Sequence, residues 1–147
     1  MVWLAHNFHP ERKICPLMAS KDCKPSLLLI AHGSRNKQAN EDLYWLAEQL
    51  QKKGFELVEP AFLELAPPDI ITAGRACVSK GALDVLMVPY FLAAGVHVRE
   101  DLTEARDTLS KEFPDVTFRL AGHLGRHARM VDMVLARIDE AQNPAGD

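Results

Sequence analysis

The chain of 147 residues has few cysteines, no long apolar run and no excess of positive charge. Its three cysteines, Cys15, Cys23 and Cys77, cannot form an even set of disulfides, so we expect free thiols, with Cys77 on the buried face of a helix. Apolar runs such as residues 27–31 are far shorter than the ~18–20 residues that cross a bilayer. The N-terminus also lacks the apolar segment of a signal peptide. We therefore expect a cytoplasmic protein.

Charge and composition exclude further classes. Lys and Arg number 17 against 20 Asp and Glu, so the net charge of −3 provides no overall basic field for nucleic acid or an anionic membrane. Hydrophobic residues make up 48% and charged residues 25%, which excludes a disordered, collagen-like or coiled-coil chain. The length fits one domain. An anionic ligand would have to be met by a local group of basic side chains.

From residue 26 onward, short apolar runs alternate with longer segments of helical period. The predicted strands cover residues 27–31, 55–63, 83–88 and 116–121. The predicted helices cover residues 36–53, 67–81, a segment that carries the apolar stripe 102–113, and residues 128–141. This alternation predicts an α/β fold, an open parallel four-stranded sheet with helices on both faces. Right-handed crossovers then place all four strand C-termini at one edge, where such sheets bind ligands.

The first 25 residues show no periodicity. We expect residues 1–25 to form an irregular N-terminal extension, residues 26–142 the domain and residues 143–147 a C-terminal tail. Met18 is an alternative start of the chain. The spacing of His6, His9, Cys15 and Cys23 is not that of a zinc site.

Histidines follow three of the predicted strands. His32 follows the first strand, His97 lies in the loop after the third, and His123 follows the fourth, with His127 close behind at a helix start. Glu64 follows the second strand. Imidazole and carboxylate ligands suit divalent cobalt, nickel, iron or zinc, and two histidines with one glutamate would form an open, labile site. The same side chains can accept protons near neutral pH, and a single histidine at such a place can also be structural.

Two loops at the same edge have compositions that suit a ligand. Gly33 permits close backbone approach, Ser34 offers a hydrogen-bonding hydroxyl and Arg35 a planar cation. The loop at residues 89–97 is unusually apolar for an exposed connection. Such a loop suits a flat hydrophobic ligand, core packing or a subunit interface.

Four motifs, in this order and spacing, resemble those of the short sirohydrochlorin chelatases of the CbiX and SirB type. They are Leu-Leu-Ile-Ala-His32-Gly-Ser-Arg, Phe62-Leu-Glu-Leu-Ala-Pro-Pro, Val-Pro-Tyr-Phe-Leu-Ala-Ala-Gly-Val-His97-Val-Arg-Glu-Asp101 and Leu124-Gly-Arg-His127, within residues 26–140. The resemblance implies a flavodoxin-like class II chelatase lobe that inserts cobalt or iron into sirohydrochlorin without ATP, for cobalamin or siroheme biosynthesis. Nickel is a further candidate metal. The resemblance also implies a homodimer, in which two lobes face a shared cleft.

The resemblance implies roles for particular residues. His32 and His97 would bind the metal and accept protons, with Glu64 near the entry path of the metal. Metalation removes two pyrrolic protons and replaces the waters of the metal, so it needs a base and a weakly held metal. The residues expected to bind the apolar ring and its carboxylates are Ser34, Arg35, Phe91, Gly95, Val96 and Arg99, with Lys37 and Arg126 also at the rim.

Two other functions remain open from the residues. One is a non-enzymatic protein that binds or delivers metal through the same two histidines and glutamate. The other is a histidine-phosphatase-like enzyme, in which an arginine precedes the nucleophilic histidine, whereas Ala31 stands there in this chain. We expect no nucleic-acid or membrane partner.

Overall fold

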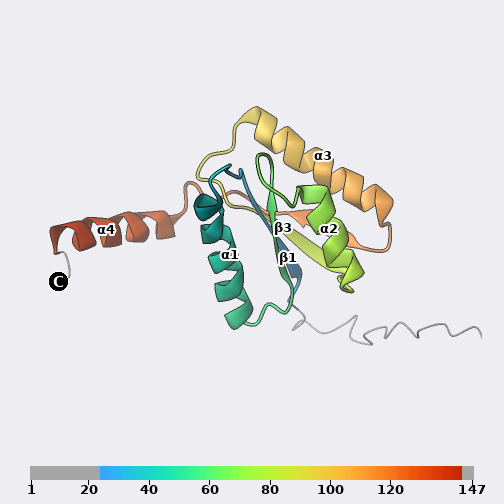
Figure 1. Ribbon diagram of the computed structural model, residues 1–147, viewed down its shortest axis with the longest axis horizontal. Helices are drawn as coiled ribbons and strands as arrows, with labels where there is room; N and C mark the ends of the chain where they lie inside the picture. The colour runs from blue at the N-terminus through green and yellow to red at the C-terminus, as the bar shows by residue number, and fades with distance from the viewer. Residues whose placement is uncertain (1–23, 144–147) are drawn as a thin grey trace, which may run out of the picture.

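The computed structural model describes residues 24–143, which form an open parallel sheet in the order β2-β1-β3-β4 (Figure 1). The strands are β1 Ser26–Ala31, β2 Val58–Phe62, β3 Asp84–Pro89 and β4 Thr117–Leu120. The helices are α1 Lys37–Lys52, α2 Ile70–Ser79, α3 Val96–Glu112 and α4 Ala128–Gln142. The predicted α/β fold is confirmed. Most of the predicted extension lies outside the described residues.

β1 lies at the centre of the sheet because it is apolar on both faces. Its four central residues are buried, and it pairs in parallel with β2 on one side and β3 on the other. A strand that is covered on both faces has a continuous run of apolar residues in its sequence, and the run at residues 27–31 predicted this strand. All four strand C-termini therefore meet at one edge of the sheet.

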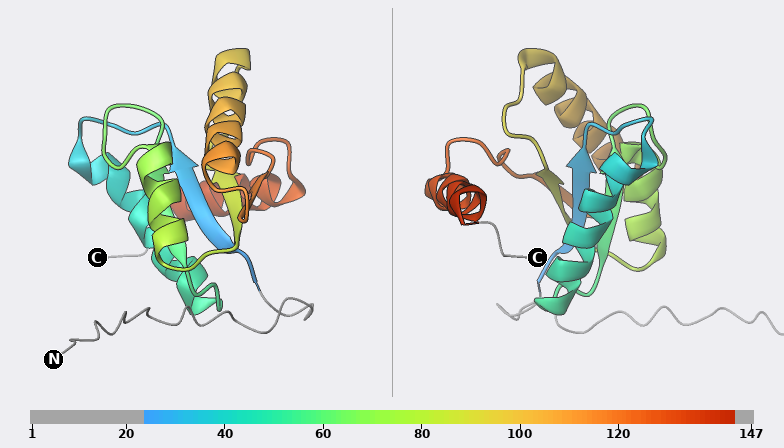
Figure 2. Two further views of the ribbon diagram at one scale, coloured as in Figure 1. Left: turned by 90° about the vertical axis from the view of Figure 1, so that its right-hand side faces the viewer. Right: turned by 60° about the vertical axis from the view of Figure 1, so that its left-hand side comes forward.

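Helices cover both faces of the sheet (Figure 2). On one face α1 packs over β1 and β2. The buried residues on that side are Leu27, Leu29, Leu43, Ala47, Val58 and Phe62. On the opposite face α2 packs over β1 and β2, α3 packs over β4, and Cys77 is fully buried as predicted.

Three predicted boundaries were wrong. α2 begins at Ile70 rather than at Pro67, because Asp69 is its N-cap and accepts from the N–H of Thr72. β2 begins at Val58 rather than at Phe55, because the N–H of Phe55 donates to the carbonyl of Leu50 and so belongs to the C-terminal turn of α1. His97 lies in the first turn of α3 rather than in a loop, because Gly95 is the N-cap of that helix and accepts from the N–H of Arg99. No helix in residues 24–143 is long and apolar enough to cross a membrane.

The last helix, α4, forms where the periodicity predicts it, but it does not lie on the sheet. Figures 1 and 2 show it set apart from the other elements, on the α1 side of the sheet. None of its residues is buried. Its apolar side chains at helical spacing, Val131, Val134, Leu135 and Ile138, are all exposed.

Candidate active site

His32 and Glu64 meet at the C-terminal edge of the sheet. His32 directly follows β1, and Glu64 lies two residues beyond β2, which pairs with β1. The imidazole Nε2 is 4.0 Å from the carboxylate Oε2, and the side chains are 55% and 60% exposed. The N–H of Glu64 also donates to the carbonyl of His32 at 2.9 Å. The pair is fixed by backbone contact, and its two functional groups are open to a ligand.

Two unusual backbone conformations hold the β1–α1 loop and the β2–α2 loop together. Gly33 has φ +93°, and a Cβ built there would lie 2.0 Å from the carbonyl oxygen of Glu64. Leu65 has φ +62°, and around it the N–H of Ala66 donates to the same carbonyl at 2.7 Å. A leucine in the left-handed region is strained, and such strain persists only where the surroundings enforce it. The close approach of the two loops thus depends on Gly33.

Asn40 fixes the loop that follows His32. It is the one buried polar side chain among residues 24–143. Its Oδ1 accepts from the N–H of Ser34 and its Nδ2 donates to the carbonyl of Ser34, each at 2.9 Å. The hydroxyl of Ser34 in turn accepts from the N–H of Asn36. Sequence reasoning missed Asn40, although its spacing from Leu43 and Ala47 puts it on the buried face of α1.

A cavity of about 370 Å³ lies between the β1–α1 and β2–α2 loops. Its lining residues are Ser34, Arg35, Lys37, Asn40, Glu41, Tyr44, Phe62, Leu65, Ala66 and Pro67. The predicted binding residues Ser34 and Arg35 are therefore both at this cavity. Arg35 and Lys37 provide positive charge at its wall, and Phe62 and Leu65 provide apolar surface.

His97 lies apart from this pair within one chain. It is on the first turn of α3, its Nδ1 is 3.6 Å from Oε2 of Glu100, and its side chain is 96% exposed. Residues 24–143 contain no group of three or more His, Cys, Asp or Glu side chains placed to hold a metal ion. The structure thus brings Glu64 to His32 but does not bring His97 to either of them.

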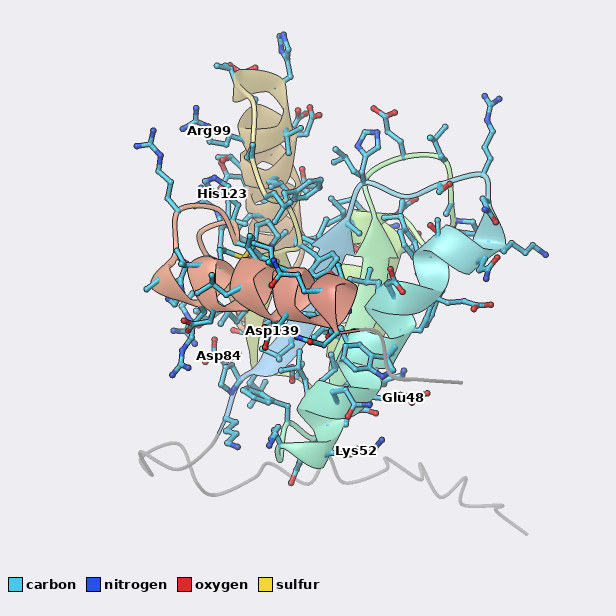
Figure 3. The ribbon with its side chains drawn as sticks, turned by 90° about the vertical axis from the view of Figure 1, so that its left-hand side faces the viewer. Glu48, Lys52, Asp84, Arg99, His123 and Asp139 are labelled. Atoms are coloured by element: carbon cyan, nitrogen blue, oxygen red, sulfur yellow. The ribbon has the colours of Figure 1, made fainter. Side chains whose placement is uncertain are left out.

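The loop between β3 and α3 exposes apolar surface. Tyr90, Leu92 and Val96 are exposed, whereas Phe91 packs partly against the core. Gly95 and Val96 begin α3, and Arg99 lies one turn further along. Val96 and Arg99 both line an open hollow of about 550 Å³ along α3. Arg99 is labelled on α3 in Figure 3.

His123 and His127 lie in the segment that leads to α4. His123 is an exposed residue of the loop after β4 (Figure 3). His127 is the N-cap of α4, where its Nδ1 accepts from the N–H of Arg129 at 3.2 Å. This bond gives His127 a structural role.

Two titrating groups of α2, one at each end of the helix, have shifted pKa values. Asp69 caps α2, and the hydrogen bond from the N–H of Thr72 to its carboxylate lowers the pKa of Asp69. Burial raises the pKa of the Cys77 thiol to about 12, so this cysteine is neutral at physiological pH.

The fold defines the class of protein: an open, flavodoxin-like α/β lobe with imidazole, carboxylate and exposed apolar groups beside its strand C-termini. More particularly, the chain belongs to the CbiX family, whose model matches residues 26–141. The resemblance in the four motifs is thereby confirmed.

Individual relatives agree with this family. The chain is 34% identical over 113 residues to the chloroplastic sirohydrochlorin ferrochelatase of Arabidopsis thaliana, a match that covers 76% of this chain and 50% of the relative. It is 33% identical to the sirohydrochlorin cobaltochelatase of Sulfolobus acidocaldarius, covering 82% of this chain and 94% of the relative. The crystal structure of the sirohydrochlorin chelatase SirB from Bacillus subtilis subspecies spizizenii in complex with cobalt matches with a TM-score of 0.73 and 28% identity, over 80% of this chain and 51% of that one. The chain spans about half the length, or less, of the first curated relatives it matches.

Proposed function

We propose that this protein is a sirohydrochlorin chelatase, which inserts divalent cobalt or iron into the tetrapyrrole ring. The observation that carries the proposal is the exposed pair of His32 and Glu64, 4.0 Å apart at the edge of a CbiX-family lobe. The names of the relatives support both metals, since one is a ferrochelatase and another a cobaltochelatase. The metal is a substrate here, and the reaction uses no ATP.

The pair suits the chemistry of metalation. The reaction must take two protons from pyrrole nitrogens, and an exposed imidazole is the side chain whose ordinary titration lies nearest neutral pH. Glu64 lies close enough to share a metal ion with His32 as the ion loses its waters. Two ligands hold a divalent metal weakly, which allows transfer to a better set of ring nitrogens.

The surroundings suit a large ring with carboxylates at its margin. Tyr90, Leu92 and Val96 offer exposed apolar surface to the face of the ring. Arg35 and Arg99 are cations placed to pair with peripheral carboxylates, together with Lys37 and Arg126, all of them exposed. The remaining members of the binding set are Ser34, Phe91 and Gly95.

The proposed active form is a homodimer. One lobe provides one wall of a site for a ring, and it leaves His97 separated from the pair of His32 and Glu64. A second copy, with its strand edge and its Phe91 loop facing the first, would supply the other wall of the cleft and a second set of the same side chains. The proposal assigns His97 to metal binding and proton transfer within that cleft.

The test is metalation of sirohydrochlorin by the full chain. Sirohydrochlorin and Co²⁺ are mixed without oxygen, with and without protein, and the shift of the tetrapyrrole absorption is followed over time. We expect a rate that exceeds the protein-free rate and rises with protein concentration, and the same series is run with Fe²⁺. Equal rates with and without protein, for both metals, would refute the function. If Co²⁺ binds in equilibrium dialysis under those conditions, the protein is instead one that binds or delivers metal.

A further inference from the structure

The fourth motif, Leu124-Gly-Arg-His127, contains neither of the histidines proposed to bind the metal. It lies between β4 and α4, in a segment that runs beside the β3–α3 loop beyond the ends of the strands (Figure 1). The N–H of Ala121 donates to the carbonyl of Met87, and the N–H of Leu124 donates to the carbonyl of Phe91, each at 2.9 Å. The pairing of β3 with β4 thus continues into the two loops.

Gly125 brings the backbones of these two loops into direct contact. A Cβ built on Gly125 would overlap the carbonyl group of Leu92, whereas a Cβ built on Gly122, earlier in the same segment, would meet no atom within 4 Å. Neither glycine has a φ in the left-handed region, so backbone freedom does not distinguish them. Position 125 therefore requires glycine for space, because the two chains pass closer than a side chain allows.

The two residues after Gly125 fix the path of the segment. Arg126 has φ +52°, a conformation that is unfavourable for a residue with a side chain and persists only where the surroundings enforce it. His127 ends the segment as the N-cap of α4, where its Nδ1 accepts from the N–H of Arg129. The motif thus supplies a hydrogen bond, a close approach, a turn and a helix cap, all of which serve one arrangement of the two loops.

The β3–α3 loop has few other anchors. The N–H of Tyr90 donates to a carbonyl of β1 at 2.7 Å, and the loop ends at the N-cap of α3. Between these points, residues 91–94 make a single backbone hydrogen bond in the described part of the chain, the one from Leu124. Phe91 packs partly against the core, but Leu92 is 66% exposed. A segment with so few hydrogen bonds and buried contacts keeps one conformation only through its neighbours.

We propose that Leu124 and Gly125 are positioning residues for the tetrapyrrole: their backbone contacts hold the β3–α3 loop, with its exposed apolar side chains, in the shape that receives the face of the ring. The inference rests on the function proposed above and gives the fourth motif its part in it. A loop that is held before the ligand arrives need not be ordered when the ligand binds, which strengthens binding. The pair of His32 and Glu64 lies on other loops, so its affinity for metal should not depend on this contact.

The first experiment compares Gly125→Ala with Gly122→Ala, which adds the same methyl group to the same segment where there is room for it. Binding of metal-free sirohydrochlorin is titrated without oxygen by its absorption, and binding of Co²⁺ alone is measured by equilibrium dialysis. We expect Gly125→Ala to bind the ring about tenfold more weakly or worse, because a misplacement of about 1 Å can cost about 100-fold. Its affinity for Co²⁺ should be that of wild type, and Gly122→Ala should bind both ligands normally.

Initial rates of cobalt insertion give a second readout on the same variants. In Gly125→Ala the loss should fall on KM for sirohydrochlorin, with kcat changed much less, as expected when an interaction with the bound ring is weakened. Amide hydrogen exchange gives a third readout, which needs no activity. Peptides covering residues 90–96 should exchange faster in Gly125→Ala, while those of β1 and α1 keep their protection.

A second variant removes the other tie without adding bulk. Leu124 is replaced by its α-hydroxy analogue, whose ester oxygen cannot donate to the carbonyl of Phe91. We expect weaker ring binding and faster exchange at residues 90–96, by a smaller amount than in Gly125→Ala. Ring affinity and exchange equal to those of wild type would contradict the proposal, even if Gly125→Ala does not fold.

The outcomes separate the inference from the proposed function. A wild-type chain that binds sirohydrochlorin but does not metalate it would refute the function, and ring affinity and exchange would still test the positioning. Equal ring affinity in wild type and Gly125→Ala would overturn the positioning while leaving the function intact. A parallel loss of ring and Co²⁺ affinity, or of protection throughout the chain, would also overturn it, because Gly125 would then support the fold as a whole.

Discussion

Gly33 and the carbonyl oxygen of Glu64 are so close that no side chain fits between them: a Cβ at position 33 would lie 2.0 Å from that oxygen. The contact joins the residue after His32 to the residue whose carboxylate lies 4.0 Å from the imidazole. The spacing of the two functional groups is therefore set by the absence of a side chain between them.

Gly33→Ala should disturb both stability and activity. The substitution places an alanine at φ +93° and forces the β2–α2 loop to move, so we expect the free energy of unfolding to fall by about 2 kcal/mol or more and metalation to slow at least about tenfold. Gly81→Ala is the matched control, since Gly81 has φ +94° with no atom within 4 Å of its built Cβ. Urea unfolding and cobalt insertion are measured on both. Equal effects of the two substitutions would show that the contact with Glu64 does not matter.

Asn40 provides a second prediction at the same loop. Asn40→Leu replaces the buried amide with an apolar side chain of similar size and leaves the N–H and carbonyl of Ser34 without their partners. We expect a loss of about 1–3 kcal/mol in unfolding free energy and slower metalation. Asn36→Ala serves as the comparison, because it removes an exposed hydrogen bond at the same loop, from the N–H of Gln38 to the N-cap side chain of α1. It should lower the free energy of unfolding by about 1 kcal/mol. Faster or unchanged metalation in Asn40→Leu would remove Asn40 from the positioning of the loop.

The capping carboxylate of Asp69 should contribute to the free energy of unfolding in a way that depends on acid pH. Its pKa is lowered in the folded state by the N–H of Thr72, so its stabilising effect is complete above the ordinary value of 3.8 and is lost as the pH falls through the lower folded value. Asp69→Ala should therefore reduce stability by about 1 kcal/mol at pH 7, with a difference that shrinks below about pH 4. Thermal unfolding at pH 7, 4 and 3 measures this. Asp69→Asn, which keeps a capping oxygen but cannot titrate there, should not show the pH-dependent part.

Residues 1–17 should be dispensable. A chain that starts at Met18 is expected to fold and to insert metal as the full chain does, because no motif of the site lies before residue 26. Unfolding free energy and cobalt insertion rate are compared between the two. Insoluble protein, or a large fall in rate, would assign residues 1–17 to the packing of the domain or to the site.

The sheet could be predicted from the sequence because each strand has its own signal. The run at residues 27–31 is apolar at every position, which a strand requires only when helices cover both faces. The sequence predicted that His32 and Glu64 lie at the same edge of the sheet, but not that their side chains meet. Their 4.0 Å spacing depends on the left-handed backbone at Gly33 and Leu65, and a Leu at such an angle carries no sequence signal.

Other features depend on tertiary contacts that periodicity does not encode. His97 was expected in a loop, yet the cap at Gly95 extends α3 back over it. Asn40 looked like one of many polar helix residues, and only its partner Ser34 shows why it is buried. The periodicity of α4 fixes which side is apolar but not what that side packs against, so its separation from the sheet could not be foreseen.

The central claim is that His32 and His97 carry the chemistry, and the most direct measurement is cobalt insertion into sirohydrochlorin by single alanine variants at saturating Co²⁺. His32→Ala and His97→Ala should fold, since both side chains are exposed, and should metalate about 100- to 10,000-fold more slowly, as the loss of a positioned proton acceptor requires. His123→Ala, an exposed histidine outside the predicted pair, should keep at least part of the activity. Near-normal turnover by His32→Ala or by His97→Ala would contradict the account and move the chemistry to Glu64.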